Sequence, residues 1–144
     1  MPYPSTQPVT ITASATLNRN THAGNLINLS AAAGLTVTLP ASAGTGDVYR
    51  FFVLTTVTSN NDIIKVANST DVIQGTVDIA AAGGVAGVTA GTTTTSDTIT
   101  MNGTTTGGII GSYIELADVS TGFWQLTGSL LASGTVATPF SATV

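Results

Sequence analysis

The chain contains no cysteine, one histidine and few charged side chains. Without cysteine there are no disulfide bonds, no thiol chemistry and no cysteine-ligated zinc site. The histidine, His22, stands in the turn-rich stretch 18–25, where nothing nearby offers the three or four nitrogen, sulfur or oxygen ligands of a zinc site. We expect His22 to be a solvated loop residue, and we expect no metal and no cofactor in this protein.

Charge is also scarce. Charged residues make up 7% of the chain, against about 25% in an average globular domain. A folded monomer of this mass exposes about 6,800 Å², which leaves about 700 Å² of surface for each charge. The exterior must then be built from Thr, Ser, Asn, Ala and Gly. This favours a chain whose surface lies against neighbours in an assembly; a weakly charged, Thr-rich domain of a secreted protein is the alternative.

The balance of charge argues against two classes of partner. Lys and Arg together number three and the net charge is −4, whereas a nucleic-acid-binding protein typically makes about 6–10 phosphate contacts. No apolar run reaches the roughly 18 residues of a membrane span, and the first residues lack the basic and apolar regions of a signal peptide. We expect neither nucleic acid nor a membrane as a partner.

No motif predicts catalysis, and we expect the protein not to be an enzyme. A Ser–His–Asp triad would have to use His22, and no G-x-S-x-G turn is present. The glycines at 44–46 and 83–84 are not followed by the Gly-Lys-Ser/Thr of a phosphate loop. The stretch 60–62 does not match a calcium-binding loop. Glu115 is expected to face solvent or to pair with Arg50 or Lys65.

Aspartates occupy the ends of several expected strands. In such places Asp commonly accepts hydrogen bonds from turn backbone, which is the role we expect for them. The residues concerned are Asp47, Asp62, Asp71, Asp78 and Asp97.

The stretch 35–55 gives the clearest local pattern. Apolar residues at 35, 37 and 39 alternate with threonines, the period of a half-buried strand, and Pro40 ends that run because it has no N–H to donate. Glycines at 44 and 46 favour a turn. Residues 49–54 are apolar almost throughout, as in a strand covered on both faces. We predict a β-hairpin whose second strand lies centrally in a sheet.

The remaining chain supplies more short strands. No segment shows helical periodicity over three turns, and some nine or ten short strands are separated by turn signals every 8–12 residues. This pattern indicates an all-β fold, an antiparallel β-sandwich or jelly roll, formed by residues 9–144 as a single domain. A β-helix is the alternative, although repeats of fixed period are not visible. The Gly-rich stretch 80–95 is predicted to be a long loop, and a weak edge strand at Val85 to Val88 is the alternative.

Two further segments carry specific expectations. Phe123 and Trp124 must face opposite sides of their strand, and the larger Trp124 is expected in the core. Residues 1–8 form an extended N-terminal arm rich in proline, which is either a disordered tail or a segment that orders against a partner. If the arm orders against a partner, we expect its residues Pro2, Tyr3, Pro4 and Pro8 to make the contact.

Four stretches resemble bacteriophage virion structural proteins. They are TVTLPASAGTGDVYRFFV (36–53), IQG (73–75), the G-x-W strand end (122–124) and SGTVATPFS (133–141). Together they cover about residues 25–141 and occur in the same order in capsid decoration proteins and modules of tail fibres. The resemblance implies an all-β, trimeric domain displayed on a virion, with no catalytic residues.

The chain lacks the long stalk of a fibre, which favours a decoration protein over a fibre. We therefore expect a capsid decoration (cement) protein that binds the major capsid protein on the outer capsid surface as a homotrimer and stabilises the shell. The N-terminal arm, with Pro2, Tyr3, Pro4 and Pro8, is then expected to be a capsid-interaction arm. The alternative is a tail-fibre or tailspike module that binds host surface glycans.

Overall fold

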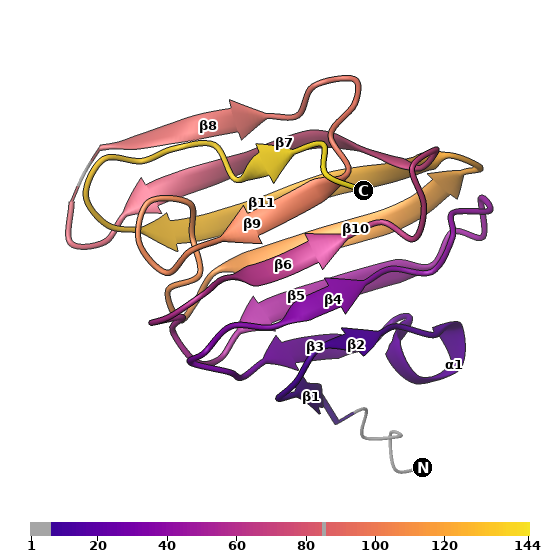
Figure 1. Cartoon of the computed structure of the whole chain (residues 1–144), viewed down its shortest axis with the longest axis horizontal. Coiled ribbons are helices and arrows are strands. Elements are labelled where there is room, and N and C mark those ends of the chain that lie inside the picture. The colour runs from indigo at the N-terminus through magenta and orange to yellow at the C-terminus, as the bar shows by residue number, and fades with distance from the viewer. Residues whose placement is uncertain (1–6, 85) are drawn as a thin grey trace, which may run out of the picture.

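The computed structural model describes residues 7–84 and 86–144, and it consists of two β-sheets packed face to face (Figure 1). The seven-stranded sheet contains, in spatial order, β1 (Val9–Ile11), β3 (Leu26–Leu29), β5 (Val48–Val53), β10 (Tyr113–Ser120), β11 (Phe123–Ala132), β7 (Val72–Ala81) and β8 (Gly87–Gly91). The five-stranded sheet contains β12 (Phe140–Ser141), β9 (Thr98–Met101), β6 (Asp62–Lys65), β4 (Thr36–Thr38) and β2 (Ala15–Thr16). One short helix, α1 (Arg19–His22), follows β2.

The core lies between the sheets and follows the expected alternation of side chains. In β5, Tyr49, Phe51 and Val53 are buried while the residues between them are only partly covered. Trp124 in β11 is 1% exposed and meets the Tyr49 ring edge-on, with centroids 5.7 Å apart. Its neighbour Phe123 is 50% exposed. The prediction that Trp124 lies in the core and Phe123 faces outward is confirmed.

The all-β sandwich is confirmed, but its sheets are mixed and not purely antiparallel. Of the ten strand pairs formed by the described residues, five are parallel and five antiparallel. The first six strands alternate between the sheets, so that β1, β3 and β5 form one parallel ladder and β2, β4 and β6 form another. The first six strands therefore wind back and forth between the two sheets. The β10–β11 hairpin then occupies the place between β5 and β7 in the seven-stranded sheet.

The hairpin predicted for residues 35–55 is wrong. Both strands exist, as β4 and β5, and β5 is flanked by β3 and β10, but β4 and β5 belong to different sheets. The linker 40–47 crosses from one sheet to the other instead of folding back within one. Its backbone N–H groups bind distant aspartates, Asp71 and Asp118, so tertiary contacts decide between a hairpin and a crossing loop.

Two stretches expected to be loops contain regular structure. Within 18–25, α1 is capped by Asn18, whose Oδ1 accepts the Thr21 N–H at 2.9 Å. His22 is 8% exposed, and its Nδ1 accepts the Asn18 backbone N–H at 3.1 Å, so the expectation of a solvated residue is wrong. Within 80–95, β8 pairs with β7 along the edge of the sheet, so this stretch does contain the edge strand given as the alternative, shifted to Gly87–Gly91.

Asp62 faces the core from the start of β6. It is fully buried; its Oδ1 accepts the Leu35 N–H at 3.2 Å, and its Oδ2 contacts no donor among the described residues. Burial raises the pKa of Asp62 from 3.8 to about 6, and the Leu35 hydrogen bond offsets only part of that effect. The folded state therefore holds this proton more tightly than the unfolded chain does.

This raised pKa predicts a loss of stability as pH rises. The free energy of unfolding should fall by about 2 kcal/mol between about pH 4.5 and pH 7, because the folded state binds more protons across that window. Asp62→Asn should remove this part of the pH dependence in urea titrations. Asp78→Asn, a change at an exposed aspartate, is the control and should retain it. An unchanged slope in Asp62→Asn would contradict the assignment.

Candidate interaction surface

Three aspartates face the core at one end of the sandwich. Asp71, Asp97 and Asp118 are between 3% and 6% exposed. Asp71 and Asp97 directly precede β7 and β9, and Asp118 lies within β10. Each is two residues from a buried side chain of that strand and so lies on the same side of it; these neighbours are Ile73, Ile99 and Leu116. Charges in such positions need hydrogen-bond partners, and the loops that close this end supply them.

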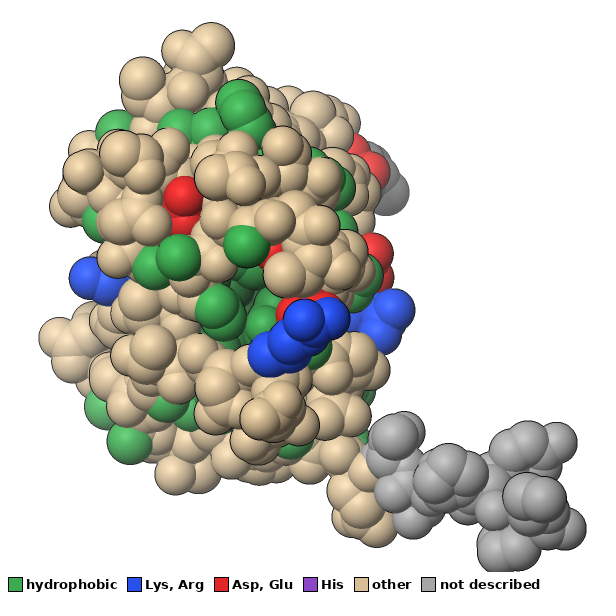
Figure 2. All heavy atoms as spheres, turned by 90° about the vertical axis from the view of Figure 1, so that its right-hand side faces the viewer, with side chains coloured by type: hydrophobic (Ala, Val, Ile, Leu, Met, Phe, Trp, Pro, Cys, Tyr) green, Lys and Arg blue, Asp and Glu red, His purple; other side chains and the backbone are tan. Residues whose placement is uncertain are grey.

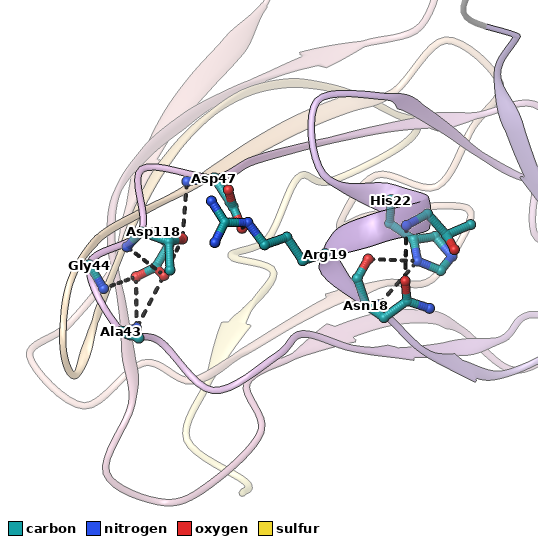
Figure 3. A network of polar contacts seen from close by, with 9 residues as sticks. Asn18, Arg19, His22, Ala43, Gly44, Asp47 and Asp118 are labelled. Carbon is teal, nitrogen blue, oxygen red and sulfur yellow. Dashed lines mark hydrogen bonds and ion pairs between the residues drawn. The ribbon is translucent and has the colours of Figure 1, made fainter.

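Asp118 holds the crossing loop 40–47. Its carboxylate accepts backbone N–H groups from Ala43 (3.1 Å), Gly44 (2.8 Å) and Thr45 (3.1 Å), and the Thr45 hydroxyl at 2.8 Å. Figure 3 shows the carboxylate facing the backbone of this loop. Burial alone would raise the pKa of Asp118, but the hydrogen bonds from Thr45, Gly44 and Ala43 outweigh it and hold the pKa below its usual value. The loop is thus fixed by a carboxylate more than seventy residues away.

Asp71 ties two neighbouring turns to the same loop. Its Oδ2 accepts the Ser42 N–H at 2.8 Å, and the Ser42 hydroxyl in turn accepts the Gly122 N–H at 2.7 Å. The loop 40–47, the turn 68–71 and residues 118–122, which comprise the end of β10 and the turn after it, therefore form one hydrogen-bonded unit. We call this unit, together with Phe123, the Asp118 end.

Two large apolar side chains project from the Asp118 end. Val119 is 56% exposed and Phe123 is 50% exposed. The register of β10 against β11 shifts between Asp118 and Ser120, so Val119 is an extra residue in its strand and turns outward. Figure 2 looks onto this end and shows hydrophobic side chains among uncharged ones, with a Lys or Arg side chain near its centre and further charged groups toward its edges. At the opposite end, Leu54 is 40% and Ile110 52% exposed.

Most charged side chains are either buried or paired with an opposite charge of the same molecule. Arg19 Nε lies 2.9 Å from Asp47, and Arg50 Nε lies 3.1 Å from Glu115, which confirms the predicted Arg50 partner for Glu115. All ten charged residues of the chain lie in its described part. Four of them are buried aspartates and four form these two ion pairs, which leaves Lys65 and Asp78. The structure therefore offers a partner very little free charge.

The predicted arm falls largely outside the described residues, which exclude Pro2, Tyr3 and Pro4. Pro8 is exposed and directly precedes β1. Because β1 runs parallel to β3 and β5, its first residue lies at the end of the sandwich where β5 begins. That is the Asp118 end, so Pro8 and the exposed Phe123 are at the same end of the molecule.

Sequence reasoning found part of this surface. The expectation that strand-end aspartates bond loop backbone is confirmed for Asp71, which accepts the Ser42 N–H in the loop 40–47. Asp62 and Asp97 also accept backbone N–H groups, but from Leu35 and Thr143, which lie outside turns. The carboxylates of Asp47 and Asp78 contact the side chains of Arg19 and Thr89 instead.

Asp118 was not among the expected capping residues, because ADVSTG reads as a tight turn. The available signal is the alternation of Ile114, Leu116 and Asp118, which places a charge on the buried side of β10.

The described part of the chain lacks two further features, a cluster of metal-ligating side chains and a helix that could span a membrane. No group of three or more His, Asp or Glu lies close enough together there to hold a metal ion. In residues 7–84 and 86–144, no helix is long and apolar enough to cross a bilayer. Comparison with known proteins gives no match to a family model, a curated protein or a solved structure.

Proposed function

We propose that this protein is a bacteriophage capsid decoration protein that binds the major capsid protein on the outer surface of the virion as a homotrimer and stabilises the shell. One observation carries the proposal: nearly all charged side chains are buried or paired within the molecule, while several large apolar side chains are exposed to solvent. Such a surface suits permanent contacts in an assembly. The resemblance of stretch 36–53 to virion proteins supports the same conclusion.

The Asp118 end is the face we propose for capsid contact. Its loops are held by side-chain hydrogen bonds from Asp71 and Asp118, so little conformational entropy is lost when a partner binds them. The exposed Phe123 ring supplies an aromatic anchor of the kind that dominates interfaces. The chain reaches Pro8 at this same end, which is where the N-terminal arm would join the contact. In this proposal the protein acts by binding and not by catalysis.

The deciding experiment adds purified protein to shells of the cognate phage that lack it. Scattering or calorimetry should then show the shells surviving a higher temperature. Unchanged shell stability with no bound protein would overturn the proposal. A light-scattering mass near 14 kDa at micromolar concentration would overturn its homotrimer component.

A pair of double variants tests which end makes the contact. Val119→Ser with Phe123→Ser should weaken shell binding by about tenfold or more, because an exposed apolar anchor is lost. Both residues are half exposed, so thermal unfolding of the free protein should change little. The matched control is Leu54→Ser with Ile110→Ser at the opposite end, which should bind shells normally. The reverse result would move the contact to the Leu54 end.

Salt should have little effect on attachment. At about 1 M salt the Debye length falls to about 3 Å, which screens exposed ion pairs. Contacts made through apolar and main-chain groups should persist, so decorated shells pelleted from low and molar salt should carry equal amounts of the protein. Release by salt alone would show that the few free charges do make the contact.

Binding to host glycans is the second candidate, and the exposed Phe123 ring is the observation that favours it, since an aromatic face can stack against a sugar. A glycan array probed with the purified protein separates the two functions. Selective glycan binding without any effect on shells would favour a tail-fibre or tailspike module.

A further inference from the structure

β8 is an unprotected edge of the seven-stranded sheet. It runs along the upper border of that sheet in Figure 1, and among the strands formed by residues 7–84 and 86–144 its single neighbour is β7. Its sequence, Gly-Val-Thr-Ala-Gly, has no charge and no proline, the residues that usually keep edge strands from pairing with other chains. The edge is therefore open to another strand.

The register of β7 and β8 shows which backbone groups face outward. Beyond the two ends of β8, the Ala81 N–H donates to the Ala86 carbonyl and the Thr92 N–H donates to the Gly75 carbonyl. Hydrogen-bonded pairs recur at every second residue of an antiparallel ladder, so Val88 and Ala90 bond to β7. The N–H and C=O groups of Gly87, Thr89 and Gly91 consequently point to the open edge.

These outward groups are arranged symmetrically about Thr89. If a second β8 approaches in the antiparallel direction with Thr89 opposite Thr89, Gly87 meets Gly91 and Val88 meets Ala90. Each outward residue then faces another outward residue, which is the arrangement for an uninterrupted ladder. We propose that β8 pairs with β8 of a second copy of this chain about a two-fold axis, joining two seven-stranded sheets into one.

The side chains beside β8 agree with this partner. Val88 is 50% exposed and is paired with the buried Ile79, so it lies on the core side of the sheet beyond the cover of the second sheet. An uncharged groove next to it is lined by Ala81, Ala86, Gly87, Gly134, Thr135 and Val136. The nearby charge, Asp78, accepts the Thr89 hydroxyl at 2.6 Å on the opposite face. The two Asp78 side chains would be three strand spacings apart, about 14 Å, which exceeds the Debye length at physiological salt.

This contact rests on β8 alone and not on the proposed function. A two-fold contact joins two copies of a monomer, and it would join two trimers if the chain is trimeric. It differs from a three-fold contact in placing residue 89 against itself, which gives a direct chemical test.

The first test uses the absence of native cysteine. In Thr89→Cys the two sulfur-bearing residues would face each other across a hydrogen-bonded pair, with Cα atoms about 5.5 Å apart, within the range of a disulfide. Mild oxidation should give a covalent pair on a non-reducing gel at least tenfold faster than in Thr127→Cys, an exposed position inside the same sheet. Equal rates would overturn the proposal.

The second test removes the outward hydrogen bonds without disturbing β7. Thr89→Pro deletes an N–H that faces the open edge, a place where an edge strand tolerates proline; Thr89→Ala keeps that N–H and loses only the hydroxyl. Sedimentation should show that Thr89→Pro weakens the two-fold association through β8 about thirtyfold. Thr89→Ala should change this association little. The β8 contact would be overturned if the wild-type chain remains a monomer at high concentration. It would also be overturned if the chain forms a trimer whose association Thr89→Pro does not change. The second of these outcomes would still agree with the proposed decoration function, which requires a trimer.

Discussion

Asp118→Ala is expected to lower the free energy of unfolding by about 3 kcal/mol. The substitution removes the acceptor for three backbone N–H groups and one hydroxyl of the loop 40–47. Hydrogen bonds to a charged group contribute about 1.5–3 kcal/mol each, and water can replace part of that total because the loop is largely exposed. Urea unfolding followed by circular dichroism measures the loss.

Two variants sharpen this result. Asp118→Asn keeps an acceptor of the same shape without the charge, so it should lose less stability than Asp118→Ala. Asp78→Ala, on the exposed face of β7, should change stability by about 0.5 kcal/mol or less. If Asp118→Ala behaves like Asp78→Ala, the loop does not depend on its carboxylate, and the case for a preorganised Asp118 end fails with it.

Gly75→Ala is expected to cost more, about 4 kcal/mol. Gly75 lies opposite Leu126 in the parallel ladder of β7 and β11, with φ at +150°. A Cβ at this position would meet the backbone oxygen of Leu126 and lie 3.0 Å from the Leu126 Cβ. Neither group can move without parting two interior strands of the sheet, so overpacking and backbone strain add together. The Ile-Gln-Gly element of the sequence thus has a structural reason for its glycine.

Gly91→Ala is the matched control for this prediction. Gly91 lies on β8, and a Cβ there would approach only the Thr76 methyl group, at 3.8 Å. Alanine should therefore be tolerated, with a change of about 0.5 kcal/mol or less in urea unfolding. Similar losses in the two variants would show that the close approach of β7 and β11 does not restrict residue 75.

Local patterns predicted most strands but not their partners. The alternation in 35–39 and the apolar run in 49–54 place β4 and β5 correctly. Whether the linker between them folds back or crosses depends on Asp71 and Asp118, and no window around residue 45 contains that information. The parallel pairing of β7 with β11 is equally non-local, because its partners are about fifty residues apart.

The interaction surface could be predicted in part. Alternation puts Phe123 and Trp124 on opposite sides of their strand, and the larger size of Trp124 identifies it as the buried one. Val119 is exposed because the register of β10 shifts next to it, and nothing in the sequence VSTG (119–122) predicts that shift. His22 is buried because Asn18 starts a helical turn that folds the ring inward, a four-residue element too short for a periodicity argument.

The position of the β10–β11 hairpin between β5 and β7 has a consequence for the order in which the chain can fold. During synthesis, β5 and β7 are complete well before residue 113, yet the strands that separate them in the sheet are still missing. The seven-stranded sheet can close only after residue 132 has emerged, so early intermediates carry two unpaired apolar edges. Folding should accordingly be slow for a domain of this size. Nascent or truncated chains that end before β10 should be the aggregation-prone species.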